Sequence, residues 1–223
     1  MPELPEVELV ARSLDKLVRN RRIAAAQLLR ERLSPFDSPP SFAAKLKNSK
    51  INFVARRGKH VLFDLDSRQT LITHLRMTGR FMLLPPEREL PKHTHAVFYF
   101  EDEPAETATR LAFQDQRHFG LMKIVETEKL HEAKEIRNLA PEPFSEEFTP
   151  RYLGEVLKRS KKNLKEVLLD QKKVCGLGNI YVSETLHRAR IDPRIAAESR
   201  SPSPSRPGCR YSAVPQPRSC PST

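Results

Sequence analysis

Residues 52–65 read NFVARRGKHVLFDL, and this stretch sets the expected fold class. Two runs rich in β-branched and aromatic residues flank RRGKH, whose glycine and charged residues are typical of a turn between strands. Similar stretches follow: TLITHLRMTGRFMLL at 70–84, HAVFYFED at 95–102 and LMKIV at 121–125. Together they predict an antiparallel β-sandwich or flattened barrel between about residues 23 and 125.

A helix is expected before the strands, over residues 1–20. Its apolar side chains recur at the i, i+3, i+4, i+7 spacing that places them on one face. They are Val7, Val10, Ala11, Leu14 and Leu17. Pro5 suits the first turn, where its missing N–H costs nothing. One helix therefore precedes the predicted sandwich, and residues 1–125 form the first predicted domain.

After residue 126 the pattern becomes helical. The predicted helical segments are TEKLHEAKEI (127–136), TPRYLGEVLKRS (149–160), KNLKEVLLD (162–170) and NIYVSETLHRAR (179–190). They predict an all-α second domain at 126–200, so the fold class is α+β. Residues 201–223 contain six prolines and six serines but no acidic residue, and we expect them to be a disordered tail.

The composition points to a polyanionic partner. Lys and Arg number 39 against 28 Asp and Glu, a formal net charge of +11. Such a surplus favours nucleic acid, although a merely basic surface produces the same number. No apolar run reaches the length of a membrane span, and the acidic start is unlike a secretory signal. We therefore expect a cytoplasmic, nucleoid-associated protein.

The cysteines do not predict a metal site. They lie at positions 175, 209 and 220, without a C-x-x-C pair or a Cys/His cluster. A structural zinc site needs four such ligands at short spacings, so no metal and no cofactor are expected.

The N-terminus itself suggests chemistry. Initiator Met1 precedes a small residue and is normally removed, which leaves Pro2 with a free secondary amine. An α-amino group with a pKa of roughly 7.7–8.0 is partly neutral and nucleophilic at physiological pH. Glu3 and Glu6 place two carboxylates beside this amine for proton transfer. The alternative is that proline and acids simply begin a helix.

Three loops combine basic and apolar residues. ARRGKH (55–60) presents Lys59 after a glycine turn, where a lysine is often just solvated. HLRMTGRF (74–81) and FQDQRHFG (113–120) place Met77 and Phe119 among basic neighbours. These neighbours are Arg76, Arg80, Arg117 and His118. The apolar side chains are either buried in the core or exposed wedges that enter a base stack while the basic ones hold phosphate.

A further basic run precedes a glycine turn. Residues 158–165 carry five basic side chains, and GLGN at 176–179 opens the next helix. A helix N-terminus with glycines and nearby lysines suits phosphate binding. The same G-x-G spacing also occurs in turns that merely join two helices.

Five motifs occur together and in order, and they strongly resemble the formamidopyrimidine-DNA glycosylase family, a relative of endonuclease VIII. They are MPELPEVE (1–8), RRGKH (56–60), HLRMTG (74–79), DQRHFG (115–120) and LDQKKVCGLGNIYVSE (169–184). The resemblance runs from residue 1 to about 200. It implies a β-sandwich followed by a helix–two-turn–helix domain, and a bifunctional DNA glycosylase and AP lyase of base excision repair.

The resemblance also implies roles for residues at the reactive end of the chain. Pro2 is the expected nucleophile that attacks the anomeric carbon and forms a Schiff base. Glu3 is expected to protonate the opening sugar ring, and Glu6 to support the same site. Lys59 resembles the family lysine that contacts phosphate and assists β-elimination.

Other positions resemble residues that hold DNA. Met77, Arg117 and Phe119 look like the trio that fills the gap left by a flipped nucleotide. His93 resembles a DNA-contacting histidine. Further along the chain, Lys165 and Asn179 look like a phosphate-holding pair, and Glu184 resembles a buried glutamate that organises the site.

The gap-filling trio resembles the branch that removes oxidised purines. It favours 8-oxoguanine and formamidopyrimidines opposite cytosine, released with β,δ-elimination. Two alternatives stay open: a non-catalytic remnant that binds damaged DNA, and a glycosylase for oxidised pyrimidines. The expected partner is double-stranded DNA with oxidised bases or abasic sites, bound by a monomer.

The sequence departs from the family pattern in two ways. Gln116, His118 and Arg76 replace residues that are usual in the loop motifs. The family's four-cysteine zinc finger is not recognisable, so the resemblance implies a truncated member. We expect the missing finger to weaken DNA binding and impair activity.

Overall fold

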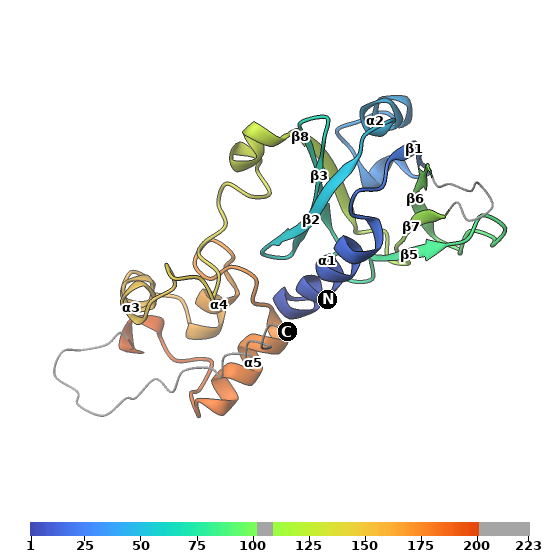
Figure 1. Ribbon diagram of the computed structural model, residues 1–223. Coiled ribbons are helices and arrows are strands. Elements are labelled where there is room, and N and C mark those ends of the chain that lie inside the picture. The colour runs from blue at the N-terminus through green and yellow to red at the C-terminus, as the bar shows by residue number, and fades with distance from the viewer. Residues whose placement is uncertain (102–108, 201–223) are drawn as a thin grey trace, which may run out of the picture.

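The computed structural model describes residues 1–101 and 109–200. The expected disordered tail, 201–223, lies outside the described residues. A β-rich part and a helical part lie side by side in Figure 1, connected by the segment that follows β8 (Leu121–Glu126). The predicted α+β class, with an antiparallel sandwich and a following helical part, is confirmed.

The first helix is α1 (Leu4–Val18), shorter at both ends than the predicted 1–20. Pro5 lies in its first turn as expected. The buried face consists of Leu4, Val7, Ala11, Leu14 and Val18. The prediction that Leu17 belongs to this face is wrong, because Leu17 is 49% exposed and Val18 continues the helical period instead.

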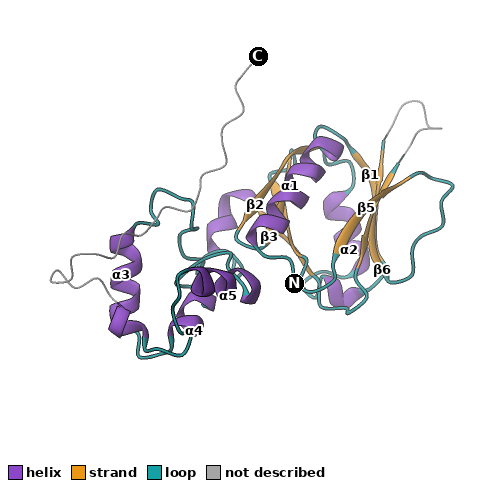
Figure 2. Cartoon of the chain, turned by 90° about the horizontal axis from the view of Figure 1, so that it is seen from below, coloured by secondary structure: helices purple, strands orange, loops and turns teal. Residues whose placement is uncertain are grey.

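Eight strands form two four-stranded antiparallel sheets (Figure 2). They are β1 (Ile23–Leu28), β2 (Ile51–Arg57), β3 (His60–Leu65), β4 (Gln69–His74), β5 (Arg80–Leu84), β6 (Thr94–Phe100), β7 (Arg110–Gln114) and β8. The strand orders are β1-β6-β7-β5 and β2-β3-β4-β8. Consecutive strands β4 and β5 therefore belong to different sheets, and so do β7 and β8. Both connections cross from one sheet to the other.

A second helix, α2 (Pro39–Leu46), interrupts the region predicted to be entirely β. The Ser38 hydroxyl caps it by accepting a hydrogen bond from the Ser41 N–H at 3.4 Å, and prolines occupy its first positions. Ser-Pro-Pro is a recognisable helix start, but the short apolar run after it resembles a strand. Helix α2 packs on β1, whereas α1 packs on β2.

The helical part contains α3 (Pro150–Lys158), α4 (Leu164–Leu169) and α5 (Asn179–Arg188). Short 3₁₀ helices among the described residues lie at Glu31–Leu33, Thr127–Glu132 and Ala197–Arg200. The predicted helix over 127–136 is therefore only a 3₁₀ turn in its first half. The basic run 158–165 spans the connection from α3 to α4.

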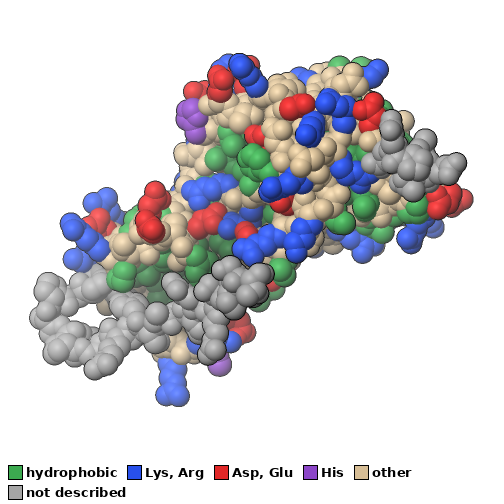
Figure 3. Space-filling view, viewed as in Figure 1, with side chains coloured by type: hydrophobic (Ala, Val, Ile, Leu, Met, Phe, Trp, Pro, Cys, Tyr) green, Lys and Arg blue, Asp and Glu red, His purple; other side chains and the backbone are tan. Residues whose placement is uncertain are grey.

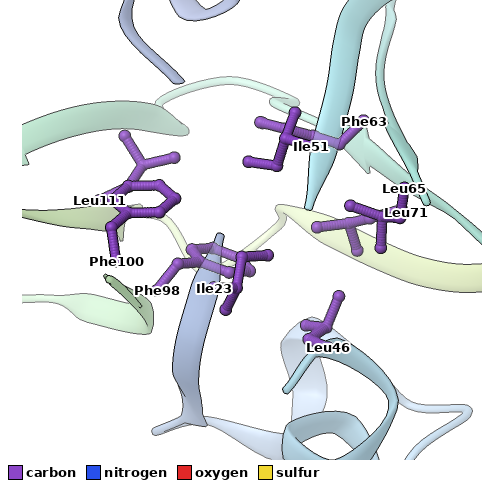
Figure 4. Close-up of a pocket in the computed structure, with 9 residues that line it drawn as sticks. All are labelled: Ile23, Leu46, Ile51, Phe63, Leu65, Leu71, Phe98, Phe100 and Leu111. Carbon is purple, nitrogen blue, oxygen red and sulfur yellow. The ribbon is translucent and has the colours of Figure 1, made fainter. Parts of the chain in front are cut away.

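Each part has its own apolar core. The larger core fills the space between the sheets and under α1 and α2, and the smaller one joins α3, α4 and α5. The sandwich encloses a cavity of about 10 Å³ lined by nine apolar side chains (Figure 4). So small a space without polar partners holds no ligand, so the sandwich interior is core and the chemistry must lie at its edges. Among the described residues, no helix is long and apolar enough to cross a membrane.

Candidate active site

The N-terminal segment and the start of α5 meet at the carboxylate of Glu3, which is 2% exposed. Its Oε2 accepts hydrogen bonds from the backbone N–H groups of Gly178 at 2.7 Å and Tyr181 at 3.2 Å. Its Oε1 accepts one from the Ile180 N–H at 2.9 Å. Helix N-termini attract negative charge, so Glu3 ties α5 to the start of α1, as their proximity in Figure 1 reflects.

This contact corrects the expectation that the GLGN turn offers its amides to a phosphate. The amides of Gly178, Ile180 and Tyr181 donate to Glu3, while the Asn179 side chain is exposed. The glycine pattern indicated that an anion binds at this turn. In the structure that anion is the Glu3 carboxylate, 175 residues before Gly178 in the sequence.

Glu6 makes a second link between the same two elements. Its Oε2 accepts a hydrogen bond from the Glu3 N–H at 2.9 Å, and its Oε1 accepts one from the Tyr181 hydroxyl at 2.8 Å. Burial by itself raises the pKa of Glu6, but these hydrogen bonds outweigh it and lower the pKa. The bond to Glu6 also raises the pKa of Tyr181. Pro2 is half-buried and directly precedes Glu3. Glu3 and Glu6 are both held by hydrogen bonds from residues at the start of α5.

Gly178 leaves no room for a side chain beside Glu3. A Cβ at this position would lie 2.4 Å from the Glu3 Cδ and 2.5 Å from its Oε1. We expect Gly178→Ala to displace the carboxylate and to lower the free energy of unfolding by about 1–3 kcal/mol. Urea unfolding measures this loss. Gly154→Ala inside α3 is the matched control, since alanine is favoured within helices; equal losses for both variants would contradict the account.

Lys59 lies in the turn between β2 and β3 and is 6% exposed. Burial lowers the pKa of Lys59, and the charge of Glu3 offsets part of that effect. The preceding Gly58 has a left-handed backbone (φ +58°), and a Cβ there would lie 2.6 Å from the Cys175 Sγ. Burial raises the pKa of Cys175 to about 11, so this thiol stays protonated and unreactive.

A partly buried ion-pair network fixes the Lys59 turn to the segment that joins the two parts. The Glu142 carboxylate accepts two hydrogen bonds from the Arg56 guanidinium, both at 2.7 Å, and one from the Gly58 N–H at 2.7 Å. Arg56 also donates to Glu8 of α1 at 2.6 Å. Bidentate Arg–carboxylate pairs have defined geometry, so β2, α1 and the joining segment are held in a fixed relation at Lys59.

The predicted gap-filling residues lie on two neighbouring turns at one end of the sandwich. Met77 is 40% exposed in the β4–β5 turn, and Phe119 is 56% exposed in the β7–β8 turn. Arg117 is exposed too, with its guanidinium 5.3 Å from the centre of the Phe119 ring. His93 is exposed just before β6. Its ring centre is 5.4 Å from that of His118 in the β7–β8 turn. These four residues are surface groups, not core.

Lys165 and Glu184, two predicted site residues of the helical part, differ in how far they are exposed to solvent. Lys165 is half-buried in the first turn of α4, where the Asn163 side chain caps the helix by accepting a hydrogen bond from the Glu166 N–H at 2.9 Å. The expectation that Glu184 is a buried organiser of the site is wrong, because Glu184 lies on the exposed face of α5. Glu3 is the buried glutamate that contacts this helix.

Charged side chains of both signs lie on the surface of the described residues. Lys and Arg side chains cover much of the face in Figure 3, interspersed with acidic ones. Among these described residues, no three His, Cys, Asp or Glu side chains are grouped to hold a metal ion. They therefore do not fit a zinc finger, and Cys209 and Cys220 lie outside the described part.

A buried histidine, His60, and the half-buried His74 near the Lys59 turn predict acid sensitivity. His60 and His74 face each other across β3 and β4, with ring centres 4.7 Å apart. Burial lowers the pKa of His60 to about 4 and that of His74 to about 3. The unfolded chain, with histidine pKa values near 6.5, takes up protons first, so stability falls as the pH drops below about 6.5.

Between pH 7 and pH 5 this effect removes about 2 kcal/mol per histidine from the free energy of unfolding. Urea unfolding at the two pH values measures it. We expect His60→Leu to reduce the difference, and His131→Gln, at an exposed position, to leave it unchanged. An identical pH difference in wild type and His60→Leu would contradict the assignment.

Family models match most of the chain. The formamidopyrimidine-DNA glycosylase N-terminal domain matches residues 1–122, and the H2TH domain of the same enzyme matches residues 139–205. The chain belongs to the formamidopyrimidine-DNA glycosylase family. Members of this family are DNA glycosylases of base excision repair with AP lyase activity, and the sequence-based assignment to it is confirmed.

Curated relatives agree over the same region. The formamidopyrimidine-DNA glycosylase of Lactobacillus johnsonii is 43% identical over 199 residues, which cover 89% of this chain and 70% of the relative. That of Bacillus licheniformis is also 43% identical over 199 residues, covering 88% and 70%.

Solved structures of the Lactococcus lactis Fpg resemble this fold. Its complex with DNA containing an abasic site is 33% identical with a TM-score of 0.81, covering 88% of this chain and 70% of that one. Its complex with DNA containing an oxidised pyrimidine has 33% identity and a TM-score of 0.82, covering 89% and 72%.

Three residues that organise this family's site here were not expected from the sequence. Tyr181 lies inside the GNIYVSE motif, Asp115 inside DQRHFG, and Glu142 in the segment before α3. Each forms a hydrogen bond with a distant segment of the chain: Tyr181 donates one, whereas Asp115 and Glu142 accept theirs. Of the three, Asp115 was the easiest to single out from the sequence, because it is an acidic residue in a loop of basic ones.

Proposed function

We propose that this chain is a bifunctional DNA glycosylase and AP lyase that removes oxidised purines, 8-oxoguanine and formamidopyrimidines, from duplex DNA. The observation that carries the proposal is the junction at the N-terminus. There Pro2 precedes the buried Glu3, which α5 holds by three amides, and the charge of the buried Lys59 interacts with Glu3. An amine, an acid and a cation at one place are the groups that Schiff-base chemistry needs.

The first step uses the Pro2 amine that Met1 removal frees. Its nitrogen forms a bond to C1′ of the damaged nucleotide, while the bond from C1′ to the base breaks and its electron pair leaves with the base. The amine then loses its proton, the sugar ring opens between C1′ and O4′, and an iminium ion forms between C1′ and the nitrogen. Glu3 takes up the proton that the amine loses and delivers it to O4′, and Glu6 holds the Glu3 N–H.

The second step cleaves the strand. The iminium ion draws electrons, so the C2′ proton becomes acidic and leaves, and the C3′–O bond breaks to release a phosphate. A second elimination removes the C4′ proton and breaks the C5′–O bond to release the second phosphate, which completes β,δ-elimination. Lys59 is proposed to hold phosphate during these steps, and water then hydrolyses the Schiff base to return the free amine.

DNA is proposed to bind along the edge that carries the exposed loops. Met77, Arg117 and Phe119 would fill the gap left by the flipped nucleotide, because an enzyme cannot reach the glycosidic bond inside the stack. His93 would contact the DNA beside them. Lys165 and Asn179 would hold phosphate from the helical part. The chain would act on double-stranded DNA as a monomer, with a binding constant that falls steeply with salt.

Incision of labelled duplexes tests the proposal. We expect cleavage of a duplex with one 8-oxoguanine opposite cytosine, and of one with an abasic site, but not of undamaged DNA. Faster cleavage of an oxidised-pyrimidine duplex would reassign the substrate to the class of lesion present in one complex of the Lactococcus lactis Fpg. Salt-sensitive binding without any strand cleavage would contradict the proposal and leave a damage-binding protein.

A further inference from the structure

The two turns that carry the exposed wedge residues are neighbours by topology. The β4–β5 turn (75–79) and the β7–β8 turn (115–120) both cross from one sheet to the other. Arg80 pairs with Gln114 in one sheet, and His74 pairs with Leu121 in the other. Each turn is thus fixed at both ends to the ends of the other, and the two lie side by side at one end of the sandwich.

Asp115 joins these two turns from inside. It is fully buried (0% exposed). Its Oδ1 accepts hydrogen bonds from the Thr78 hydroxyl of the other turn and from the Arg117 N–H at 3.2 Å. Its Oδ2 accepts one from the Gly120 N–H at 2.7 Å. One carboxylate therefore fixes the start, middle and end of its own turn together with the neighbouring turn.

Thr78 makes the link reciprocal. Besides donating to Asp115, its hydroxyl oxygen accepts a hydrogen bond from the Arg117 N–H at 3.1 Å. Burial raises the pKa of Asp115, but the bonds from Thr78 and from the turn amides outweigh it and lower the pKa. The carboxylate is therefore ionised at neutral pH, and charge-assisted hydrogen bonds are the strong ones.

Both turns contain a residue in an unfavourable backbone conformation. Arg76 has φ +55° and His118 has φ +60°, in the left-handed region that non-glycine residues seldom adopt. Such conformations persist where the surroundings determine them. Next to each strained residue stand the exposed side chains of Met77 on one turn and of Arg117 and Phe119 on the other.

We propose that Asp115 is a positioning residue that couples the two turns, so that Met77, Arg117 and Phe119 enter DNA as one rigid unit. The inference rests on the proposed function and extends it, since Asp115 is buried and touches neither substrate nor the reacting atoms. Separate flexible turns would have to be ordered on each encounter, whereas a coupled pair is ordered beforehand. Asp115 accordingly governs opening of the lesion and leaves the chemistry at Pro2 alone.

Two variants and a control separate coupling from general stability. Asp115→Asn keeps the size of the side chain but removes its charge, and Thr78→Val removes the donor from the opposite turn. Asp37→Asn is the control, because Asp37 is also buried and bonded, to Lys45 at 2.6 Å, in the segment before α2. Thr78→Val keeps the test valid if Asp115→Asn fails to fold.

The first readout needs no chemistry. A duplex with a stable abasic-site analogue and 2-aminopurine opposite it reports insertion of the wedge as a rise in fluorescence. We expect wild type and Asp37→Asn to give the rise, and both coupling variants to lose at least half of it at saturating protein. The double variant should lose no more than the worse single variant, because coupled sites are non-additive.

The second readout compares two substrates. Excision of 8-oxoguanine from a duplex should slow about tenfold or more in each coupling variant. Borohydride trapping on a single strand with a preformed abasic site, where there is no gap to fill, should change less than twofold. Equal loss on both substrates, additive effects, or an undiminished fluorescence rise would overturn the inference. Failure of wild type to be trapped would instead overturn the proposed function, while the fluorescence readout still decides on the coupling.

Discussion

A Pro2→Gly variant is expected to cut a duplex containing 8-oxoguanine at least about 10³-fold more slowly than wild type, with DNA affinity nearly unchanged. The variant exchanges a ring-held secondary amine for a flexible primary amine, and misplacing a nucleophile costs an enzyme about this much. Glycine keeps an N-terminal amine but loses the pyrrolidine ring, which fixes the backbone angle before Glu3 and makes the amine secondary. Single-turnover incision, with binding measured separately, gives the comparison.

The choice of glycine controls for processing of the terminus. Both proline and glycine are small, so Met1 is removed from either chain and a free amine results. A Pro2→Leu variant, which retains Met1, should be as inactive as Pro2→Gly although its fold is intact. Full activity of Pro2→Leu would contradict the assignment of the nucleophile to position 2.

Glu3→Gln is expected to lower the rate of incision by about 10²–10³-fold. The carboxylate uses both oxygens as acceptors, from Gly178 and Tyr181 on one side and Ile180 on the other. A glutamine has one acceptor oxygen, and its amide group would face a backbone N–H that it cannot satisfy. An unpaired buried donor costs about 1–3 kcal/mol, so the free energy of unfolding should fall as well.

Glu6→Gln is the matched control for Glu3→Gln. Glu6 is exposed and accepts from one amide and one hydroxyl, so an amide side chain there leaves fewer buried groups unpaired. We expect its incision rate to fall less than that of Glu3→Gln and its stability to change by less than about 1 kcal/mol. Rates are compared at a temperature where unfolding shows both variants to be folded. Equal rates for the two variants would contradict the central role of Glu3.

Local patterns predicted the parts of the fold that depend on neighbours in the sequence. The periodicity of α1 and six of the described strands follow from short-range spacing, whereas β1 and β7 lie outside the stretches that were expected to be strands. Helix α2 was missed because its eight residues are too few to establish a helical period against a strand-like composition. Leu17 was wrongly assigned to the buried face for a similar reason. Leu17 and Val18 are both apolar, and the spacing alone did not show which of the two faces the core.

The site was predictable in composition but not in arrangement. The N-terminal residues suggested Pro2 and Glu3, and the resemblance supplied the role of Lys59. The partner of Glu3 is decided by how α5 docks on α1, which no local pattern contains. The same docking directs the amides of Gly178, Ile180 and Tyr181 to Glu3 and leaves Glu184 exposed. Asp115 was overlooked because its hydrogen-bond partner Thr78 lies in another turn, 37 residues away in the sequence.

The most direct test of the account is borohydride trapping on a duplex with an abasic site, followed by peptide mapping of the covalent adduct. We predict a trapped complex in which the DNA remnant is attached to the nitrogen of Pro2. Lys59 is the competing amine, because burial lowers the pKa of Lys59 and leaves more of it neutral. An adduct on Lys59, or no adduct at all under conditions where the duplex is bound, would contradict the account.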